Sequence, residues 1–161
     1  MDKQLEKLYQ DQIKNEWYSA YLYLSMAAYF ESINLEGFAH WMYRQAGEEQ
    51  EHGKKMSQFL IDRGIKVVLQ AIPQPPADFA SAVEVFEKSL EHEQKVTALI
   101  NGIADMADKC NDRPSKVFIQ WFITEQVEEE KNASRILDLL KKIPANSAGI
   151  FQLDHQLSKR E

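Results

Sequence analysis

Apolar residues recur every three or four positions along most of this chain, a periodicity typical of amphipathic helices. The pattern predicts four long helices at residues 4–33, 36–63, 81–110 and 114–143, followed by a short fifth helix at 146–158. Gly64 is expected at the C′ position just past the second helix. Pro114 is expected to be the first residue of the fourth, where its fixed φ suits a helix start.

The links between these helices predict their directions. The first and third links are short, so the helices that they join should be antiparallel neighbours. The middle link, residues 65–79, contains three prolines that prevent a continuous helix. Its 15 residues reach at most about 50 Å when extended, which is enough to return along the bundle. The predicted fold is therefore an all-α four-helix bundle with one long crossover and a short fifth helix.

Length and composition agree with a single helical domain over residues 1–161. The chain has only 6 Gly and 5 Pro, and it is rich in helix-forming residues. A net charge of -6 without a block of Lys or Arg argues against a nucleic-acid partner. No apolar run approaches the ~20 residues of a membrane span, and the first residues resemble no signal or transit peptide. We therefore expect a cytoplasmic protein without a membrane partner.

Each long helix carries polar residues inside its apolar stripe, near its midpoint. They are Glu16 on the first helix, Glu49 and His52 on the second, Glu93 on the third, and Gln126 and Glu129 on the fourth. In an antiparallel bundle, the midpoints of all four helices lie at one level. These side chains are therefore expected to converge inside the bundle.

Carboxylates that meet inside a bundle need a compensating charge, because burying each one alone costs several kcal/mol or raises its pKa until it is neutral. Two divalent cations would supply that charge, held by Glu16, Glu49, His52 and Glu93, with Glu129 as a further candidate ligand. A mixed carboxylate and imidazole set with open positions suits iron better than calcium or structural zinc. The alternative is that the stripes are one residue out of phase and that these acids lie on solvated helix faces.

Five segments together resemble the ferritin family, specifically the bacterial and archaeal non-haem ferritins: NEWYSAYLYLSMAAYF, GFAHWMYRQAGEEQEHGKKM, VFEKSLEHE, FITEQVEEE and GIFQLDHQLSKR. The resemblance covers nearly the whole chain and implies a ferritin-like bundle. It also implies a di-iron centre, with one iron held by Glu16, Glu49 and His52, the other by Glu49, Glu93 and Glu129, and Gln126 close by.

The same resemblance implies further roles beside the di-iron centre. Bacterial members have a third iron site on the cavity side, with a pattern matched by Glu48, Glu125, Glu128 and Glu129. Tyr23 matches a tyrosine beside the di-iron centre, and Trp121 matches a nearby tryptophan that can supply an electron. Plain core packing would explain Tyr23 and Trp121 equally well.

Three departures from related families narrow the resemblance to the non-haem ferritins. The fourth helix has Gln126-x-x-Glu129 where bacterioferritins and rubrerythrins have a second Glu-x-x-His. Gln50 stands in place of the methionine that ligates haem in bacterioferritins, so no haem is expected. The single Cys110 cannot supply the four-cysteine iron domain of rubrerythrins.

The function that the resemblance implies is iron storage and detoxification. A ferroxidase would oxidise Fe²⁺ with O₂ (or H₂O₂) and deposit ferric oxyhydroxide inside a homo-oligomeric cage of 24 subunits. One alternative is a peroxidase or oxygenase on the same bundle, which would keep the ligands and store no iron. Another is a non-catalytic bundle or a mini-ferritin that protects DNA, which the acidic charge, the intact ligand set and the fifth helix disfavour.

Overall fold

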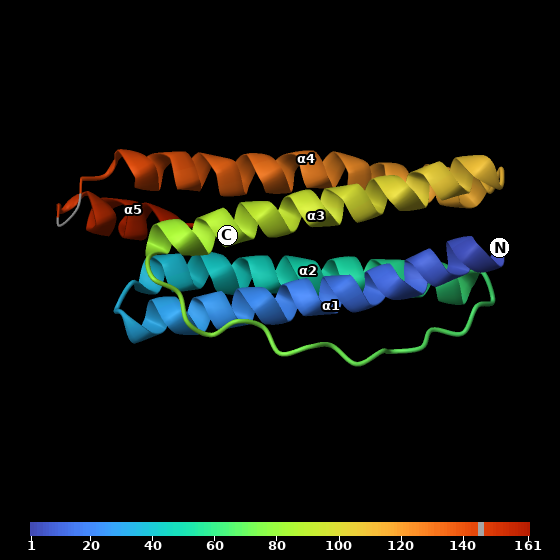
Figure 1. Ribbon diagram of the computed structural model, residues 1–161, viewed down its shortest axis with the longest axis horizontal. Helices are drawn as coiled ribbons and strands as arrows, with labels where there is room; N and C mark the ends of the chain where they lie inside the picture. Colours follow the sequence, from blue (N-terminus) through green and yellow to red (C-terminus); the bar gives the residue numbers. More distant parts are fainter. Residues whose placement is uncertain (145–146) are drawn as a thin grey trace.

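The computed structural model describes residues 1–144 and 147–161, and this part of the chain forms helices and no strands (Figure 1). The helices are α1 (Lys3–Ser32), α2 (Glu36–Asp62), α3 (Ala82–Lys109), α4 (Arg113–Lys142) and α5 (Gly149–Leu157). The four long helices begin and end within one residue of their predicted positions. The predicted start of the fifth helix at residue 146 lies outside the described residues. Within the described ranges, no helix is both long and apolar enough to cross a lipid bilayer.

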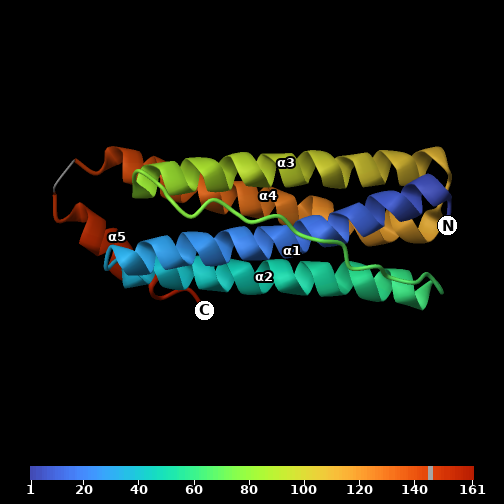
Figure 2. The same cartoon turned by 60° about the horizontal axis from the view of Figure 1, so that its bottom comes forward.

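The helices form an elongated bundle in which α1 lies beside α2 and α3 lies beside α4 (Figures 1 and 2). Each of these pairs is antiparallel, whereas α2 and α3 run in the same direction. The crossover at residues 63–81 returns along α1 for the length of the bundle. Gln10 Nε2 on α1 donates to the Lys66 carbonyl at 2.8 Å, and Ser25 Oγ donates to the Pro76 carbonyl at 2.6 Å. The predicted crossover topology is therefore confirmed.

Local capping determines where the helices stop and start. Gly64 has a φ of 71° just past α2, as expected for a glycine that ends a helix in the left-handed conformation. The side chain of Asp112 caps α4 by accepting a hydrogen bond from Ser115 N at 3.0 Å. Because Asp112 is the cap, Arg113 is the first helical residue and Pro114 the second, so the predicted start was one residue late.

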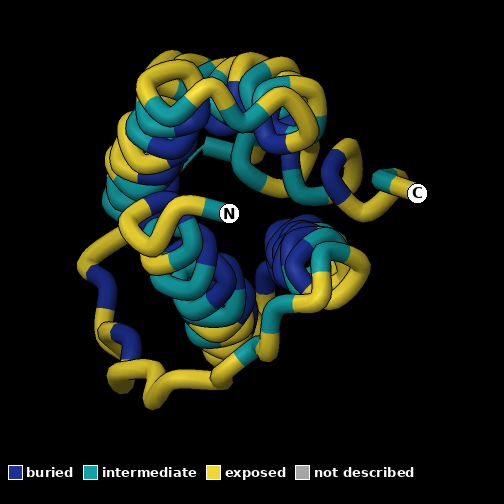
Figure 3. The backbone as a smooth tube through the Cα atoms, turned by 90° about the vertical axis from the view of Figure 1, so that its right-hand side faces the viewer, coloured by how far each residue is buried: buried dark blue, intermediate teal, exposed yellow. Residues whose placement is uncertain are grey.

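Two apolar clusters fill the bundle, one toward each end, and the inward faces of the helices are buried (Figure 3). The cluster next to α5 contains Phe30 and Phe38, whose rings stack with centroids 4.9 Å apart. The cluster at the opposite end contains Tyr9, Met56 and Phe122. The sequence positions of the predicted polar residues fall between these clusters on all four helices.

The short helix α5 packs against the start of α2. Leu153 and Leu157 are buried there, and the carboxylate of Asp154 accepts a hydrogen bond from Phe38 N at 2.9 Å. Phe151 also belongs to the apolar residues of this segment, but its side chain is 65% exposed. Two positions along a helix correspond to about 200° of rotation, so Phe151 lies opposite Leu153.

Candidate metal centre

The polar residues predicted to converge are buried between the two apolar clusters. At most 5% of the surface of each is exposed, for Glu16, Glu49, His52, Glu93, Gln126 and Glu129. All four long helices contribute to this layer. The apolar stripes are therefore in phase, and the alternative that these acids lie on solvated faces was wrong.

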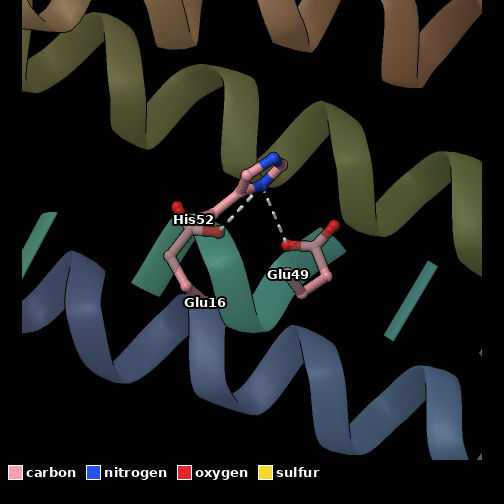
Figure 4. A group of neighbouring side chains, drawn as sticks. All are labelled: Glu16, Glu49 and His52. Atoms are coloured by element: carbon pink, nitrogen blue, oxygen red, sulfur yellow. Dashed lines mark ion pairs between the residues drawn. The ribbon is translucent and has the colours of Figure 1, made fainter. Parts of the chain in front are cut away.

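The first potential metal-binding group joins α1 to α2. Glu49 and His52 are three residues apart on α2, a spacing that places both side chains on one helix face. Glu16 faces them from α1 (Figure 4), with its Oε2 3.8 Å from His52 Nδ1, and Glu49 Oε2 lies 3.6 Å from the same nitrogen. One ligand atom from each residue lies within 4.8 Å of the others, close enough for the three to bind one cation.

A second group extends from α2 to α3 and α4. Carboxylate oxygens of Glu49, Glu93 and Glu129 lie within 4.8 Å of one another. Glu49 belongs to both groups and therefore links them. A third grouping of His52, Glu125 and Glu129, also within 4.8 Å, adjoins the other two.

Burial favours the protonated forms of these carboxyl groups when no cation is bound. Desolvation is the largest cause of the increase in pKa for all four groups. The pKa values of Glu16, Glu49 and Glu93 are raised, and that of Glu129 is raised to about 8. Repulsion from the neighbouring carboxylates adds to the increase for Glu16, Glu49 and Glu129. Among the described residues, Glu16 Oε2 has no hydrogen-bond partner. This layer therefore favours binding of cations, which would replace the protons.

Two glutamines support the carboxylates, and the sequence interpretation gave them no role. Gln12 Nε2 donates to Glu16 Oε1 at 2.8 Å. Gln45 Nε2 donates to Glu129 Oε2 at 2.7 Å and to Glu49 Oε1 at 3.2 Å. Each glutamine precedes a buried glutamate by four residues, and this spacing in the sequence could have identified both.

Tyr23 and Gln126 both contact Glu93. The buried Tyr23 hydroxyl donates to the Glu93 carboxylate, and it lies 3.0 Å from Ser89 Oγ. Burial raises the pKa of Tyr23 well above its usual value, with a further contribution from Glu93. Gln126 Nε2 lies 3.3 Å from Glu93 Oε2 and is bonded at the same distance to Thr97 Oγ1. Together they orient the carboxylate that α3 contributes.

Trp121 lies at the edge of the centre, where an open pocket of about 820 Å³ reaches His52. The centroids of the Trp121 and His52 rings are 5.4 Å apart. The Lys55 ammonium lies 3.6 Å from the centroid of the Trp121 ring, and Glu48 and Glu125 line the same pocket. We call this cavity the lateral pocket.

The four residues predicted for a third iron site have different surroundings. Glu129 and Glu125 lie together with His52. Glu48 lines the lateral pocket, but its carboxylate is paired with the Arg160 guanidinium at 2.5 Å. Glu128 is exposed and belongs to no potential metal-binding group within residues 1–144 and 147–161. The structure thus brings two of these acids to His52, and Glu48 only to the pocket.

Comparison with known proteins agrees with this fold. Residues 6–143 match the ferritin-like domain of the ferritin family. A bacterial non-heme ferritin of Bacteroides fragilis is 39% identical over 160 residues, covering 99% of both chains. One from Staphylococcus saprophyticus is 36% identical, covering 99% of this chain and 96% of its own. The open pore ferritin of the archaeon Archaeoglobus fulgidus superimposes with a TM-score of 0.98 at 41% identity, covering 100% of this chain and 99% of its own. The chain therefore belongs to the ferritin family.

Proposed function

We propose that this protein is a ferroxidase that oxidises Fe²⁺ with O₂ (or H₂O₂) and stores the product as ferric oxyhydroxide inside a protein cage. The observation that carries the proposal is the pair of buried ligand groups that share Glu49. The names of the relatives, as ferritins of bacteria and of an archaeon, support the same function.

In this proposal two Fe²⁺ ions bind as substrates at neighbouring positions. Glu16, Glu49 and His52 hold one ion, and Glu49, Glu93 and Glu129 hold the other. Carboxylates are hard ligands that favour Fe³⁺ over Fe²⁺, so this ligand set promotes oxidation. The unpartnered Oε2 of Glu16 supports the assignment, because a buried carboxylate oxygen without a donor is costly unless a cation binds it.

The surrounding residues orient the ligands and complete the electron balance. Gln12 and Gln45 fix one oxygen each of their partner carboxylates, leaving the others for metal. Two Fe²⁺ ions supply two electrons, whereas reduction of O₂ to water needs four. The two electrons of the iron pair suffice to reduce O₂ to H₂O₂. For reduction to water, we assign a third electron to Tyr23, which is bonded to Glu93, or to Trp121, which lies beside His52, and the fourth to an Fe²⁺ ion at the third iron site described below.

The third iron site of the proposal lies between the di-iron centre and the lateral pocket. Its ligands are Glu125 and Glu129, with His52 at the shared edge. Glu48 and the exposed Glu128 are further candidates, and each would have to turn toward the ion. An Fe²⁺ ion bound at this site would assist oxidation. Alternatively, the site would receive Fe³⁺ on its way from the di-iron centre to the pocket.

Storage requires a closed shell around the mineral, and we propose a homo-oligomer of 24 subunits for this role. Exposed apolar side chains on the crossover support this proposal, because contact with another subunit would bury them. Val68 and Leu69 are 55% and 73% exposed, and Ile72 lies close to them along the chain. The cytoplasmic location expected from the sequence stays a prediction.

Aerobic loading with Fe²⁺ followed by size-exclusion chromatography tests storage. We expect a particle much larger than the 18.7 kDa chain, with iron eluting in the same fractions. A monomer or dimer, or a large particle without iron, would favour a peroxidase or oxygenase on the same bundle. The Glu91→Ala variant should load iron as the unsubstituted protein does, because Glu91 is an exposed glutamate on α3.

A further inference from the structure

The residues that follow α5 fold back onto α2 and are held there through Arg160. The guanidinium lies over the Trp41 ring, 4.4 Å from its centroid. Its Nη1 donates to the Trp41 carbonyl at 3.2 Å, and the Arg160 carbonyl lies 2.7 Å from His40 Nε2. Arg160 is therefore fixed at one place on α2 by both its side chain and its backbone.

The same guanidinium holds the carboxylate of Glu48. Arg160 Nη2 donates to Glu48 Oε2 at 2.5 Å, and the two side chains are 18% and 40% exposed. Glu48 lines the lateral pocket together with His52, four residues further along α2. Arg160 is thus paired with a carboxylate at the wall of the pocket that leads to the metal centre.

We propose that Arg160 is a positioning residue that withholds Glu48 from cations in the lateral pocket. While the ion pair is intact, a cation at His52, Glu125 and Glu129 has no ligand from Glu48. When Arg160 leaves, Glu48 is free to turn toward the pocket and adds a carboxylate to the site. This inference rests on the third iron site of the proposed function and assigns its regulation to the segment after α5.

The position of Arg160 links this regulation to the seating of α5. Leu153 and Leu157 are buried against the bundle. Arg160 comes three residues after Leu157 in the sequence. A shift of α5 would move Arg160 away from Trp41 and Glu48. If Arg160 only anchored α5, its replacement would leave cation affinity in the lateral pocket unchanged.

Titration with Tb³⁺ tests the proposal, because Tb³⁺ prefers oxygen ligands and its luminescence is sensitised by a nearby tryptophan such as Trp121. The assembled protein would carry Glu16→Gln and Glu93→Gln, which remove one ligand from each buried group. These substitutions leave His52, Glu125 and Glu129 in place. The titration then reports the lateral pocket and does not depend on Fe²⁺ oxidation.

We expect Arg160→Gln to lower the apparent Kd for Tb³⁺ about two- to five-fold, the range that corresponds to a partly exposed ion pair. Glu48→Gln should abolish this gain, so that Arg160→Gln has no effect in the double variant. Weaker or unchanged binding in Arg160→Gln would overturn the proposal.

Arg160→Lys provides a second measurement if Arg160→Gln does not assemble. Lysine cannot reproduce the guanidinium fork that contacts both Trp41 and Glu48, so a smaller gain in affinity is expected. An affinity equal to that of the Arg160 protein would contradict the proposal. If the proposed ferroxidase function is wrong, the failure appears in Fe²⁺ oxidation, whereas failure of the Arg160 proposal appears in Tb³⁺ affinity. The two failures are therefore distinguishable.

Discussion

At the scale of single residues, the buried carboxyl groups face opposite requirements with and without metal. Without cations, burial favours their protonated forms. Cation binding requires the ionised forms, so it releases protons and its affinity increases with pH. The same side chains therefore destabilise the metal-free protein at a pH that would favour cation binding.

The first prediction concerns the pH dependence of the metal-free protein. In the folded chain Glu129 keeps its proton up to a pKa of about 8, whereas its ordinary value is 4.5. The folded state then binds more protons than the unfolded state, so stability falls as pH rises from about 4.5 to about 8. Glu129→Gln should lessen this fall and raise the free energy of unfolding at pH 8 by roughly 1–4 kcal/mol.

Chemical unfolding in the presence of a chelator, from pH 5 to pH 8, measures this difference. Glu91→Gln is the matched control, because Glu91 is exposed and its removal should leave the slope unchanged. Parallel curves for Glu129→Gln and the unsubstituted protein would contradict the assigned pKa of Glu129.

At the scale of elements, the contact between α2 and α5 depends on Gly37. A Cβ atom at this position would lie 1.8 Å from the Asp154 carbonyl oxygen, so a side chain cannot fit without displacing backbone. Gly37→Ala should therefore detach α5 or shift it, at a cost of about 1–3 kcal/mol. Limited proteolysis near Lys142, at the end of α4, should become faster.

Gly47→Ala is the matched control for this substitution. Gly47 also lies within α2, but nothing lies within 4 Å of a Cβ built there. Alanine should stabilise the helix by roughly 0.5–1 kcal/mol and leave proteolysis near Lys142 unchanged. Equal proteolysis rates for Gly37→Ala and Gly47→Ala would contradict the close packing of α5.

A second prediction for elements concerns the junction between α2 and α4. Arg63 donates to both carboxylate oxygens of Asp112, at 2.7 and 2.9 Å, and this pairing lowers the pKa of Asp112 to about 2. The resulting stability is present above the ordinary value of 3.8 and is lost as pH falls toward 2. Asp112→Asn, which keeps a capping oxygen, should cost about 1–2 kcal/mol at pH 7.

Urea unfolding at pH 7 and near pH 2 checks this prediction. The cost of Asp112→Asn should shrink at the lower pH, because Asp112 itself becomes protonated there. Asp108→Asn is the control, since Asp108 pairs with Lys116 on the surface and is 73% exposed. A cost independent of pH would show that the charge on Asp112 does not stabilise this junction.

The sequence predicted these elements and the buried polar layer because both depend on short-range periodicity. Glu16, for example, is identified by its three- and four-residue distances from apolar neighbours on its own helix. The pairing of Glu48 with Arg160 could not be predicted, since 112 residues separate them and their contact depends on where α5 docks. Periodicity also did not reveal that Phe151 would face away from the bundle.

At the scale of the whole molecule, the candidate metal centre lies in the middle of a long bundle, between two apolar clusters that exclude water from its ends. The lateral pocket gives the centre one open side. In the proposed cage this pocket would receive the oxidised iron, and the exposed apolar residues of the crossover would contact other subunits.

The central claim is that Fe²⁺ is oxidised at the site of Glu16, Glu49 and His52, and stopped-flow absorbance during aerobic mixing with Fe²⁺ tests it most directly. The protein with Glu16→Ala and His52→Ala is compared with the unsubstituted protein, with Glu91→Ala as control. Loss of two ligands should slow the fast phase by more than about tenfold, whereas Glu91→Ala should oxidise Fe²⁺ at the full rate. Equal fast rates in the doubly substituted and unsubstituted proteins would contradict the assignment of this site.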